Sequence, residues 1–289
     1  MLMPTQAPPL RNAMTIDVED YFQVSAFAPY IDRSAWDRLE CRVERNVERI
    51  LALLAESDTR ATFFTLGWVA QRHPQLVRRI VDNGHELASH GYGHERASDL
   101  SPEAFRADVG HAKQLLEDIG GQAVLGYRAP SFSIAKGNLW AFDVLRDCGY
   151  RYSSSVYPIR HDHYGMPDSP RFAYPVREGL LEVPVTTLRL HGRNLPSSGG
   201  GYFRLLPYAL SRWMIGQVNR VDGQSAVFYF HPWEIDVAQP RVPGIDAKTR
   251  FRHYVNIGRT ESRIARLLRD FSWGRMDEIF LGPARQPRP

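Results

Sequence analysis

Two histidines in the segment SHGYGHE, residues 89–95, have the spacing of two ligands to one metal ion. In a helix, the imidazoles of His90 and His94 would face the same side, about 5–6 Å apart at Cβ, which suits a zinc-type site. Pairs with this spacing also arise by chance in a chain with ten histidines, and the two glycines between them disfavour a simple helix.

The acidic segment Asp17-Val18-Glu19-Asp20 can supply a carboxylate to such a site. Three carboxylates within four residues repel one another unless a positive charge lies among them. On a strand, Asp17 and Glu19 would face the same side, whereas Asp20 is suited to cap a helix. Two imidazoles and one carboxylate leave open positions for water and substrate, as catalytic zinc sites do. An acidic turn or cap without a metal is the alternative interpretation.

Two further segments carry residues suited to catalysis. Arg128, in YRAPSF, keeps its charge and can hold a carboxylate by a bidentate contact, with a structural salt bridge as the alternative. His231, in YFHPWE, is suited to general acid or base catalysis, with a buried structural histidine as the alternative. Trp233 beside it could stack on a sugar or belong to the core.

These four segments follow β-prone runs that alternate with stretches of helical spacing. We expect strands at residues 13–18, 60–66, 85–89, 122–127, 150–154 and 225–231, and helices at 42–56, 74–83, 102–119, 137–147, 207–220 and 247–270. This alternation predicts a parallel sheet, open or closed into a barrel. Both architectures keep their sites at the carboxyl ends of the strands. Segment 153–205 breaks the pattern and contains hairpin-like strands.

Composition excludes several classes of protein. Of the 289 residues, 43% are hydrophobic and 24% charged, as in globular proteins, and two cysteines exclude a disulfide scaffold. No run of about 18 apolar residues occurs, so we expect no transmembrane segment.

Without a readable signal peptide we expect a cytoplasmic protein, or one at a membrane surface. Basic and acidic residues alternate, so nucleic acid is not an expected partner despite the net charge of +4. The oligomeric state stays open.

The segments ATFFTLG, NGHELASHGYGHE, YRAPSFS and FYFHPWE resemble, in this order and spacing, the motifs of the polysaccharide deacetylase family, the NodB-homology carbohydrate esterases. The resemblance covers about residues 13–235 and implies a single-domain α/β fold, a distorted (β/α)7 barrel. TIDVEDYF and HPWE resemble the branch associated with bacterial exopolysaccharide and exosortase gene clusters. We accordingly expect four regions: a disordered N-terminus at 1–11, a deacetylase domain at 12–235, a C-terminal extension packed on the barrel at 236–281, and a disordered tail at 282–289.

The resemblance implies a catalytic role for three residues. Asp17 matches the catalytic base, His231 the catalytic acid, and Arg128 the arginine that positions the base. The late D-x-x-W motif of the family has no clear counterpart, and the stretch YRYSSSVYP occupies its region.

The resemblance also implies a metal site. His90 and His94 match two ligands of a divalent ion, most often Zn²⁺, with Co²⁺, Ni²⁺ or Mn²⁺ as alternatives. The commonest family pattern has two adjacent aspartates, but Val18 follows the base here. A D-x-D spacing therefore favours Glu19 as the third ligand, with Asp20 as the alternative.

From these residues we expect a hydrolase that acts on carbon–nitrogen bonds other than peptide bonds. Its expected substrate is an N-acetylated glycan, either a bacterial polysaccharide or its lipid-linked precursor in exopolysaccharide biosynthesis, and acetate is released. The first alternative is a small-molecule amidohydrolase or deformylase on the same fold. The second is a catalytically inactive sugar-binding scaffold.

Overall fold

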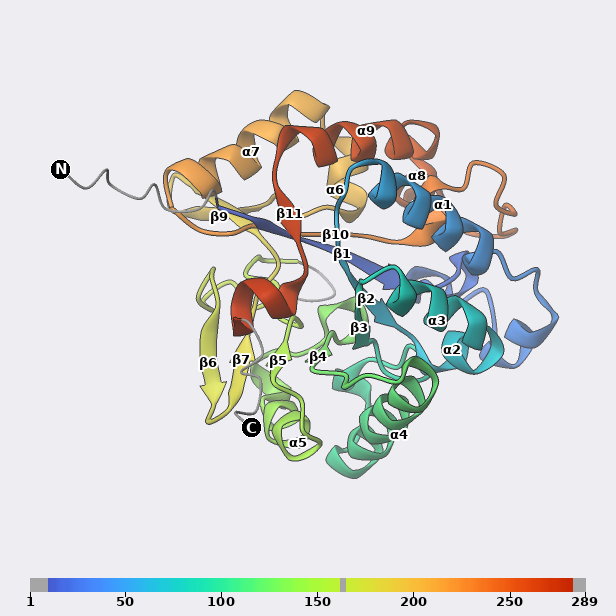
Figure 1. The fold of residues 1–289 in the computed structure, drawn as a ribbon. Helices are drawn as coiled ribbons and strands as arrows, with labels where there is room; N and C mark the ends of the chain where they lie inside the picture. Colours follow the sequence, from blue (N-terminus) through green and yellow to red (C-terminus); the bar gives the residue numbers. More distant parts are fainter. Residues whose placement is uncertain (1–9, 162–164, 283–289) are drawn as a thin grey trace.

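A curled, mostly parallel sheet forms the centre of the computed structural model, which describes residues 10–161 and 165–282 (Figure 1). Its strands are β1 (Asn12–Val18), β2 (Thr62–Thr65), β3 (Glu86–Ser89), β4 (Gly126–Tyr127), β5 (Tyr152–Ser153), β6 (Tyr174–Arg177), β7 (Leu180–Glu182), β10 (Val227–Phe230) and β11 (Trp273–Gly274). They follow the order β10-β1-β2-β3-β4-β5-β7-β6, and β11 pairs with β1. All pairs from β10 to β7 are parallel, and β6 is antiparallel to β7. No described strand joins β6 to β10, so the sheet forms a half-barrel.

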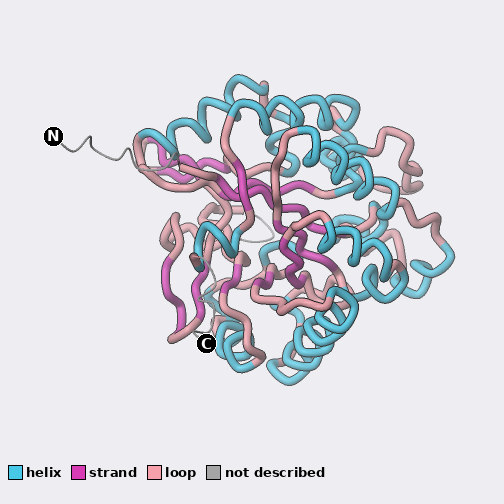
Figure 2. Tube along the Cα trace, viewed as in Figure 1, coloured by secondary structure: helices cyan, strands magenta, loops and turns pink. Residues whose placement is uncertain are grey.

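Helices lie around the outside of the curled sheet, as the cyan segments of Figure 2 show. The α-helices are α1 (Val43–Glu56), α2 (Gly67–Arg72), α3 (Pro74–Asp82), α4 (Pro102–Gly120), α5 (Trp140–Asp147), α6 (Gly200–Leu205), α7 (Tyr208–Arg220), α8 (Ala247–Tyr254) and α9 (Ile257–Asp270). Short 3-10 helices occupy Tyr21–Gln23 (η1), Ser25–Phe27, Arg33–Arg38, Ala97–Asp99, Pro130–Phe132, Lys136–Asn138 and Pro232–Ile235 (η7), and a π-helical turn occupies Asp277–Leu281. A separate hairpin joins β8 (Thr187–Leu190) to β9 (Arg193–Pro196).

Local sequence explains where the main helices begin and end. In α4, the Ser101 side chain accepts a hydrogen bond from the backbone N–H of Ala104, Pro102 occupies the first turn, and Gly121 ends the helix at φ 65°. In α1, the apolar residues recur at helical spacing and are buried against the sheet. The expected helices at 42–56, 74–83, 102–119 and 207–220 are confirmed within a few residues.

Strand β1 is buried on both faces because helices cover one side and the barrel interior the other. Met14, Ile16 and Val18 belong to the large apolar cluster that includes residues of α1, α7 and α9. Residues alternate across a strand, so Thr15 and Asp17 point the opposite way, into the interior. The period of the strand thus brings Asp17 to the inner face at the carboxyl end of the sheet.

The single long helix expected at 247–270 is wrong, because the chain forms two helices, α8 and α9. They are separated at Asn256, which has a left-handed backbone conformation with φ 53°. The guanidinium of Arg204, from α6, donates hydrogen bonds to three carbonyl groups at the end of α8. These carbonyls therefore have hydrogen-bond donors even though the helix does not continue beyond them.

The expected α/β fold is confirmed as a half-barrel, and hairpin strands occur within segment 153–205. The sequence does not predict α2, α6, β6 or β11, and strand 122–127 contracts to β4. Residues 1–9 and 283–289, most of the two ends expected to be disordered, lie outside the described residues. Within residues 10–161 and 165–282, no helix combines the length and apolar character that a membrane span needs.

Candidate active site

Glu19, His90 and His94 come together at the carboxyl ends of β1 and β3. One side-chain ligand atom from each lies within 4.8 Å of the others, and all three residues are buried. His94 Nε2 lies 2.6 Å from Glu19 Oε2, yet no described donor is aligned to form a hydrogen bond with that buried oxygen. Two imidazole nitrogens and a buried carboxylate oxygen are a donor set that fits a divalent transition metal ion.

The loop that carries the two histidines is not helical, which the glycines between them already suggested. Gly91 has φ 75° and His94 has φ 58°, both in the left-handed region. His90 donates from Nδ1 to the carbonyl of Arg128 at 2.7 Å, which leaves Nε2 as the free ring nitrogen. Burial lowers the pKa of His90 to about 4, so its imidazole is neutral and available as a ligand.

Charge explains how Glu19 can be ionised inside the protein. Burial alone would raise the pKa of Glu19, but its electrostatic interactions with the imidazoles of His94 and His231 outweigh burial, and the net shift is strongly downward. The indole N–H of Trp233 also donates to Glu19 Oε1 at 3.1 Å. Trp233 is 5% exposed and therefore offers no platform for a sugar.

Asp20 points away from this group and caps two helices. Its carboxylate accepts hydrogen bonds from the backbone N–H groups of Tyr21, Arg42 and Val43, at the starts of η1 and α1. Burial raises the pKa of Asp20 in spite of these hydrogen bonds. Of the two carboxylates considered as the third ligand, the structure brings Glu19 to the histidines and uses Asp20 as a cap.

Asp17 and Arg128 form a buried ion pair beside the same group. Arg128 Nη1 lies 2.7 Å from Asp17 Oδ1 and also donates to Thr15 Oγ1. The remaining guanidinium nitrogens donate to Ser154, and the guanidinium lies 4.1 Å from the ring centre of Phe64. The bidentate contact considered for Arg128 is therefore wrong, since a single nitrogen holds Asp17 and the other donors fix the arginine.

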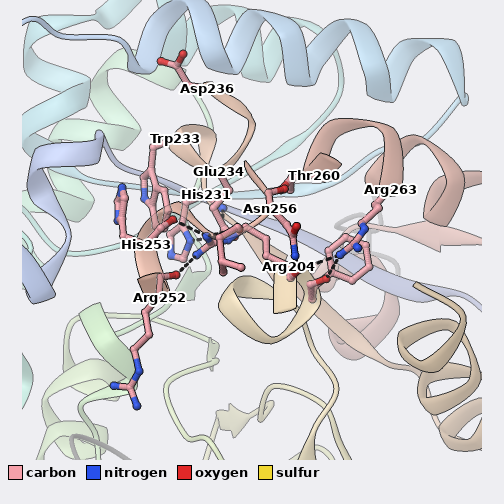
Figure 3. Close-up of polar contacts among 12 residues, drawn as sticks. Arg204, His231, Trp233, Glu234, Asp236, Arg252, His253, Asn256, Thr260 and Arg263 are labelled. Carbon is pink, nitrogen blue, oxygen red and sulfur yellow. Dashed lines mark hydrogen bonds and ion pairs between the residues drawn. The ribbon is translucent and has the colours of Figure 1, made fainter. Parts of the chain in front are cut away.

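His231 faces Asp17 and Glu19 from β10. Its Nε2 lies 3.8 Å from Asp17 Oδ2 and 3.6 Å from Glu19 Oε1, and its side chain keeps 18% exposure. On the other side of the ring, Nδ1 donates to Glu234 Oε1 at 2.6 Å (Figure 3). Burial would lower the pKa of His231, but the carboxylates of Glu19, Glu234 and Asp17 outweigh it and raise the value to about 9. The protonated form is favoured at neutral pH.

Of the seven residues singled out by the sequence for catalysis or metal binding, six lie in one group, namely Asp17, Glu19, His90, His94, Arg128 and His231. Asp20, the alternative metal ligand, caps η1 and α1 instead. The role of Glu234 and the contact of Trp233 with a carboxylate were not predicted from the sequence. A signal for Glu234 was present, because an acidic residue three positions after His231 can close a capping box.

Comparison with known proteins divides the chain into two matched segments. Residues 34–153 match the family model "Polysaccharide deacetylase", and residues 154–281 match a domain of unknown function, DUF3473. His90, His94 and Arg128 lie in the first segment and His231 in the second. Asp17 and Glu19 precede both.

The curated relatives match about a third of the chain. A chitooligosaccharide deacetylase of Sinorhizobium fredii is 38% identical over 100 residues, which cover 33% of this chain and 42% of the relative. A peptidoglycan-N-acetylglucosamine deacetylase of Bacillus cereus is 31% identical over 94 residues, 32% of this chain and 34% of the relative. The chain thus spans less than half the length of these relatives.

Solved structures extend the similarity of fold to the whole chain. A Mycobacterium smegmatis crystal structure assigned to the polysaccharide deacetylases has a TM-score of 0.61 at 21% identity, covering 100% of this chain and 98% of that chain. The PuuE allantoinase has a TM-score of 0.58 at 15% identity, with 100% of both chains covered. At these identities the comparison bears on the fold alone.

Proposed function

We propose that this chain, whose residues 34–153 match the polysaccharide deacetylase family model, hydrolyses the N-acetyl group of an acetylated amino sugar and releases acetate. The observation that supports this most is the group of Glu19, His90 and His94 beside Asp17 and His231. It combines a metal-type donor set with one candidate base and one candidate acid. A sugar-binding scaffold would need neither of the last two.

Glu19, His90 and His94 would hold a divalent metal ion, for which Zn²⁺ is our expectation. When bound, such an ion supplies Lewis acidity toward a carbonyl oxygen and a water molecule. The buried Oε2 of Glu19, which lies 2.6 Å from His94 Nε2, and the neutral imidazole of His90 are the features of this chain that fit the ion.

The proton transfers fall to Asp17 and His231. Asp17 Oδ2 accepts a proton from the attacking water as a new bond forms between the water oxygen and the acetyl carbon. His231 donates its Nε2 proton to the amide nitrogen as the carbon–nitrogen bond breaks, so that the sugar leaves as an amine. Arg128 holds Asp17 through Oδ1, which leaves Oδ2 to face the reaction. The products are acetate and a free amino sugar.

The glycan we expect is a bacterial polysaccharide, or its lipid-linked precursor in exopolysaccharide biosynthesis. The relatives named for chitooligosaccharide and peptidoglycan deacetylation motivate N-acetylglucosamine oligomers as the first substrates to test. A small-molecule amidohydrolase on the same fold is the second candidate, and the allantoinase structure supports it only as an analogy of fold.

The test is acetate release by the full chain supplied with Zn²⁺, on N-acetylglucosamine oligomers and on isolated exopolysaccharide. We expect release that a chelator abolishes and that Asp17→Asn reduces about 10²–10⁴-fold, the usual contribution of one acid–base group. Asp168→Asn, at an exposed salt bridge, is the matched control. Equal release by Asp17→Asn would refute the role of Asp17. Hydrolysis of a ureide or formamide without acetate release would favour the amidohydrolase.

A further inference from the structure

Behind His231, a buried ion pair joins two elements that are 30 residues apart in the chain. Arg204 Nε, on α6, lies 2.6 Å from Glu234 Oε2, on η7, and both residues are almost fully buried. The other carboxylate oxygen, Oε1, accepts the Nδ1–H of His231 at 2.6 Å and its backbone N–H at 3.1 Å. Each oxygen of Glu234 is therefore committed to one partner, and the His231 ring is held from behind (Figure 3).

Arg204 itself has no freedom to move away from Glu234. Its Nη1 donates to the carbonyls of His253 and Val255, at 2.5 and 3.2 Å, and its Nη2 donates to the carbonyl of Arg252 at 3.0 Å. Its own carbonyl accepts the side-chain N–H of Asn256 at 2.8 Å. The end of α8 therefore fixes the guanidinium, and the guanidinium fixes Glu234.

A second contact from α8 supports η7, the short helix that follows His231. The rings of His231 and Trp233 are stacked with centres 5.1 Å apart, and the rings of Trp233 and His253 are stacked with centres 4.2 Å apart. His253 is held in turn by Gln239, 2.7 Å from its Nε2. Two elements of the segment matched by the domain of unknown function, α6 and α8, thus meet at the HPWE sequence.

Stability alone does not account for this arrangement. Burying a carboxylate and a guanidinium together costs a large desolvation free energy, and apolar residues of similar volume often stabilise a fold as well or better. What the pair provides is geometry. An Nδ1–H donated to a fixed carboxylate sets the tautomer and the orientation of an imidazole, and so directs Nε2 toward Asp17 and Glu19.

We propose that Glu234 is the positioning residue of the catalytic acid His231, that Arg204 holds Glu234 in place, and that the segment of unknown function thereby completes the active site. This inference rests on the proposed function, in which His231 protonates the leaving nitrogen. The competing explanation is that Glu234 serves only as the cap of η7, through the backbone N–H of His231.

Two substrates with different leaving groups separate these explanations. An amine must be protonated to leave an N-acetyl sugar, whereas 4-nitrophenolate leaves 4-nitrophenyl acetate without an acid. For Glu234→Gln we expect kcat on an N-acetylglucosamine oligomer to fall about 10²–10⁴-fold, with KM little changed. On 4-nitrophenyl acetate we expect a loss of less than about tenfold, because no acid catalysis is needed. Arg204→Lys keeps the charge but loses the planar fork, so we expect a smaller loss with the same preference.

Asp236→Asn is the matched control, because it breaks another buried ion pair at the end of η7 without touching His231. Asp236 accepts from Arg42 at 2.6 Å, and we expect this variant to affect both substrates equally. If Glu234→Gln and Arg204→Lys also slow both substrates equally, the residues are structural and the proposal is overturned. If the wild-type chain releases acetate from neither the sugar nor the ester, the proposed function fails instead.

A spectroscopic measurement tests the premise without turnover, on wild-type protein with ¹⁵N-labelled histidine. A short charged hydrogen bond from Nδ1 of His231 to a buried carboxylate predicts a far-downfield proton resonance, assigned by its loss in His231→Gln. We expect Arg204→Lys to shift that resonance and Asp236→Asn to leave it in place. Absence of the resonance in the wild-type protein would overturn the proposal, even if the Glu234 variant does not fold.

Discussion

His90 and His231 lie on the same candidate site but are held by different parts of the chain in different ways. The backbone N–H of His90 donates to the carbonyl of Thr65, and the ring donates to the carbonyl of Arg128. The loop after it is joined to α2 by two more backbone hydrogen bonds, from Gly67 and Trp68. His231, in contrast, is held by the side chains of η7 and by those that lie behind them.

The difference predicts how each half of the site responds to substitution. Backbone contacts depend on the register of the sheet, so most changes to neighbouring side chains should leave His90 in place. A ring held by side chains depends on each of them, including Arg204, which does not contact it. The half of the site matched by the domain of unknown function should therefore be the more sensitive to distant substitutions.

Loss of a ligand from the backbone-held half should have the largest effect. His90→Ala removes one of three donors, so we expect metal content to fall from about one ion per chain to almost none. Elemental analysis of the purified, dialysed protein measures this. His191→Ala, at an exposed residue outside the site, is the matched control. Metal content equal to that of the wild type would refute the assignment of His90 as a ligand.

A smaller effect should follow from Trp233→Phe in the side-chain-held half. Phenylalanine keeps an aromatic ring but loses the N–H that donates to Glu19 Oε1. Removing a partner that orients a ligand typically costs about 10–100-fold in metal affinity or activity, and we expect a loss in that range. Competition with a chromophoric chelator measures the affinity.

Trp273→Phe is the control for that variant. Trp273 is also buried, and its indole N–H donates to the carbonyl of Leu267 at 3.0 Å, away from the candidate metal ligands. We expect its metal affinity to equal that of the wild type. Similar losses in both variants would mean that the effect comes from general loosening of the fold rather than from Glu19.

The sequence predicts much of this fold because its signals are local. Ser101 and Gly121 mark the ends of α4, and the apolar period of α1 identifies its buried face. The helix expected at 247–270 fails because the periodic pattern passes through Asn256 without interruption. The contacts that end α8 come from Arg204, about 50 residues earlier, and no local pattern contains them.

In the candidate site, too, local signals identified some residues and long-range contacts hid others. Asp17 lies near the carboxyl end of β1, and His90 and His231 directly follow β3 and β10, so the rule that sites gather at carboxyl ends of strands identified them in advance. The resemblance then suggested a role for each. Glu234 and Arg204 escaped because their pairing depends on α6, an element that the sequence did not predict. Contacts between side chains distant in sequence are specified by the packed fold rather than by spacing.

A buried carboxylate at the opposite end of the sheet can be compared with Glu19, since we expect it to affect the stability of the fold but not the candidate metal site. Glu86 begins β3, is buried, and accepts from Tyr152, Thr62 and the backbone of Asp277. Burial, together with the charge of Asp277, raises the pKa of Glu86 to about 8. Unlike Glu19, it has no positive neighbour that outweighs its burial.

The raised pKa fixes the sign of a pH dependence. Between pH 4.5, the ordinary pKa of a glutamate, and about pH 8, the folded protein binds more protons at Glu86 than the unfolded chain does. The free energy of unfolding should therefore fall as pH rises through this window and level off above it. Glu86→Gln removes the titration, so the contrast in stability between about pH 5 and about pH 9 should shrink, by a few kcal/mol at most, since one pKa unit corresponds to about 1.4 kcal/mol. Urea denaturation at both pH values measures this difference in the free energy of unfolding. Glu261→Gln, at an exposed ion pair, is the control. An unchanged contrast would refute the raised pKa, and a loss of metal affinity in Glu86→Gln would contradict the separation of the two ends of the sheet.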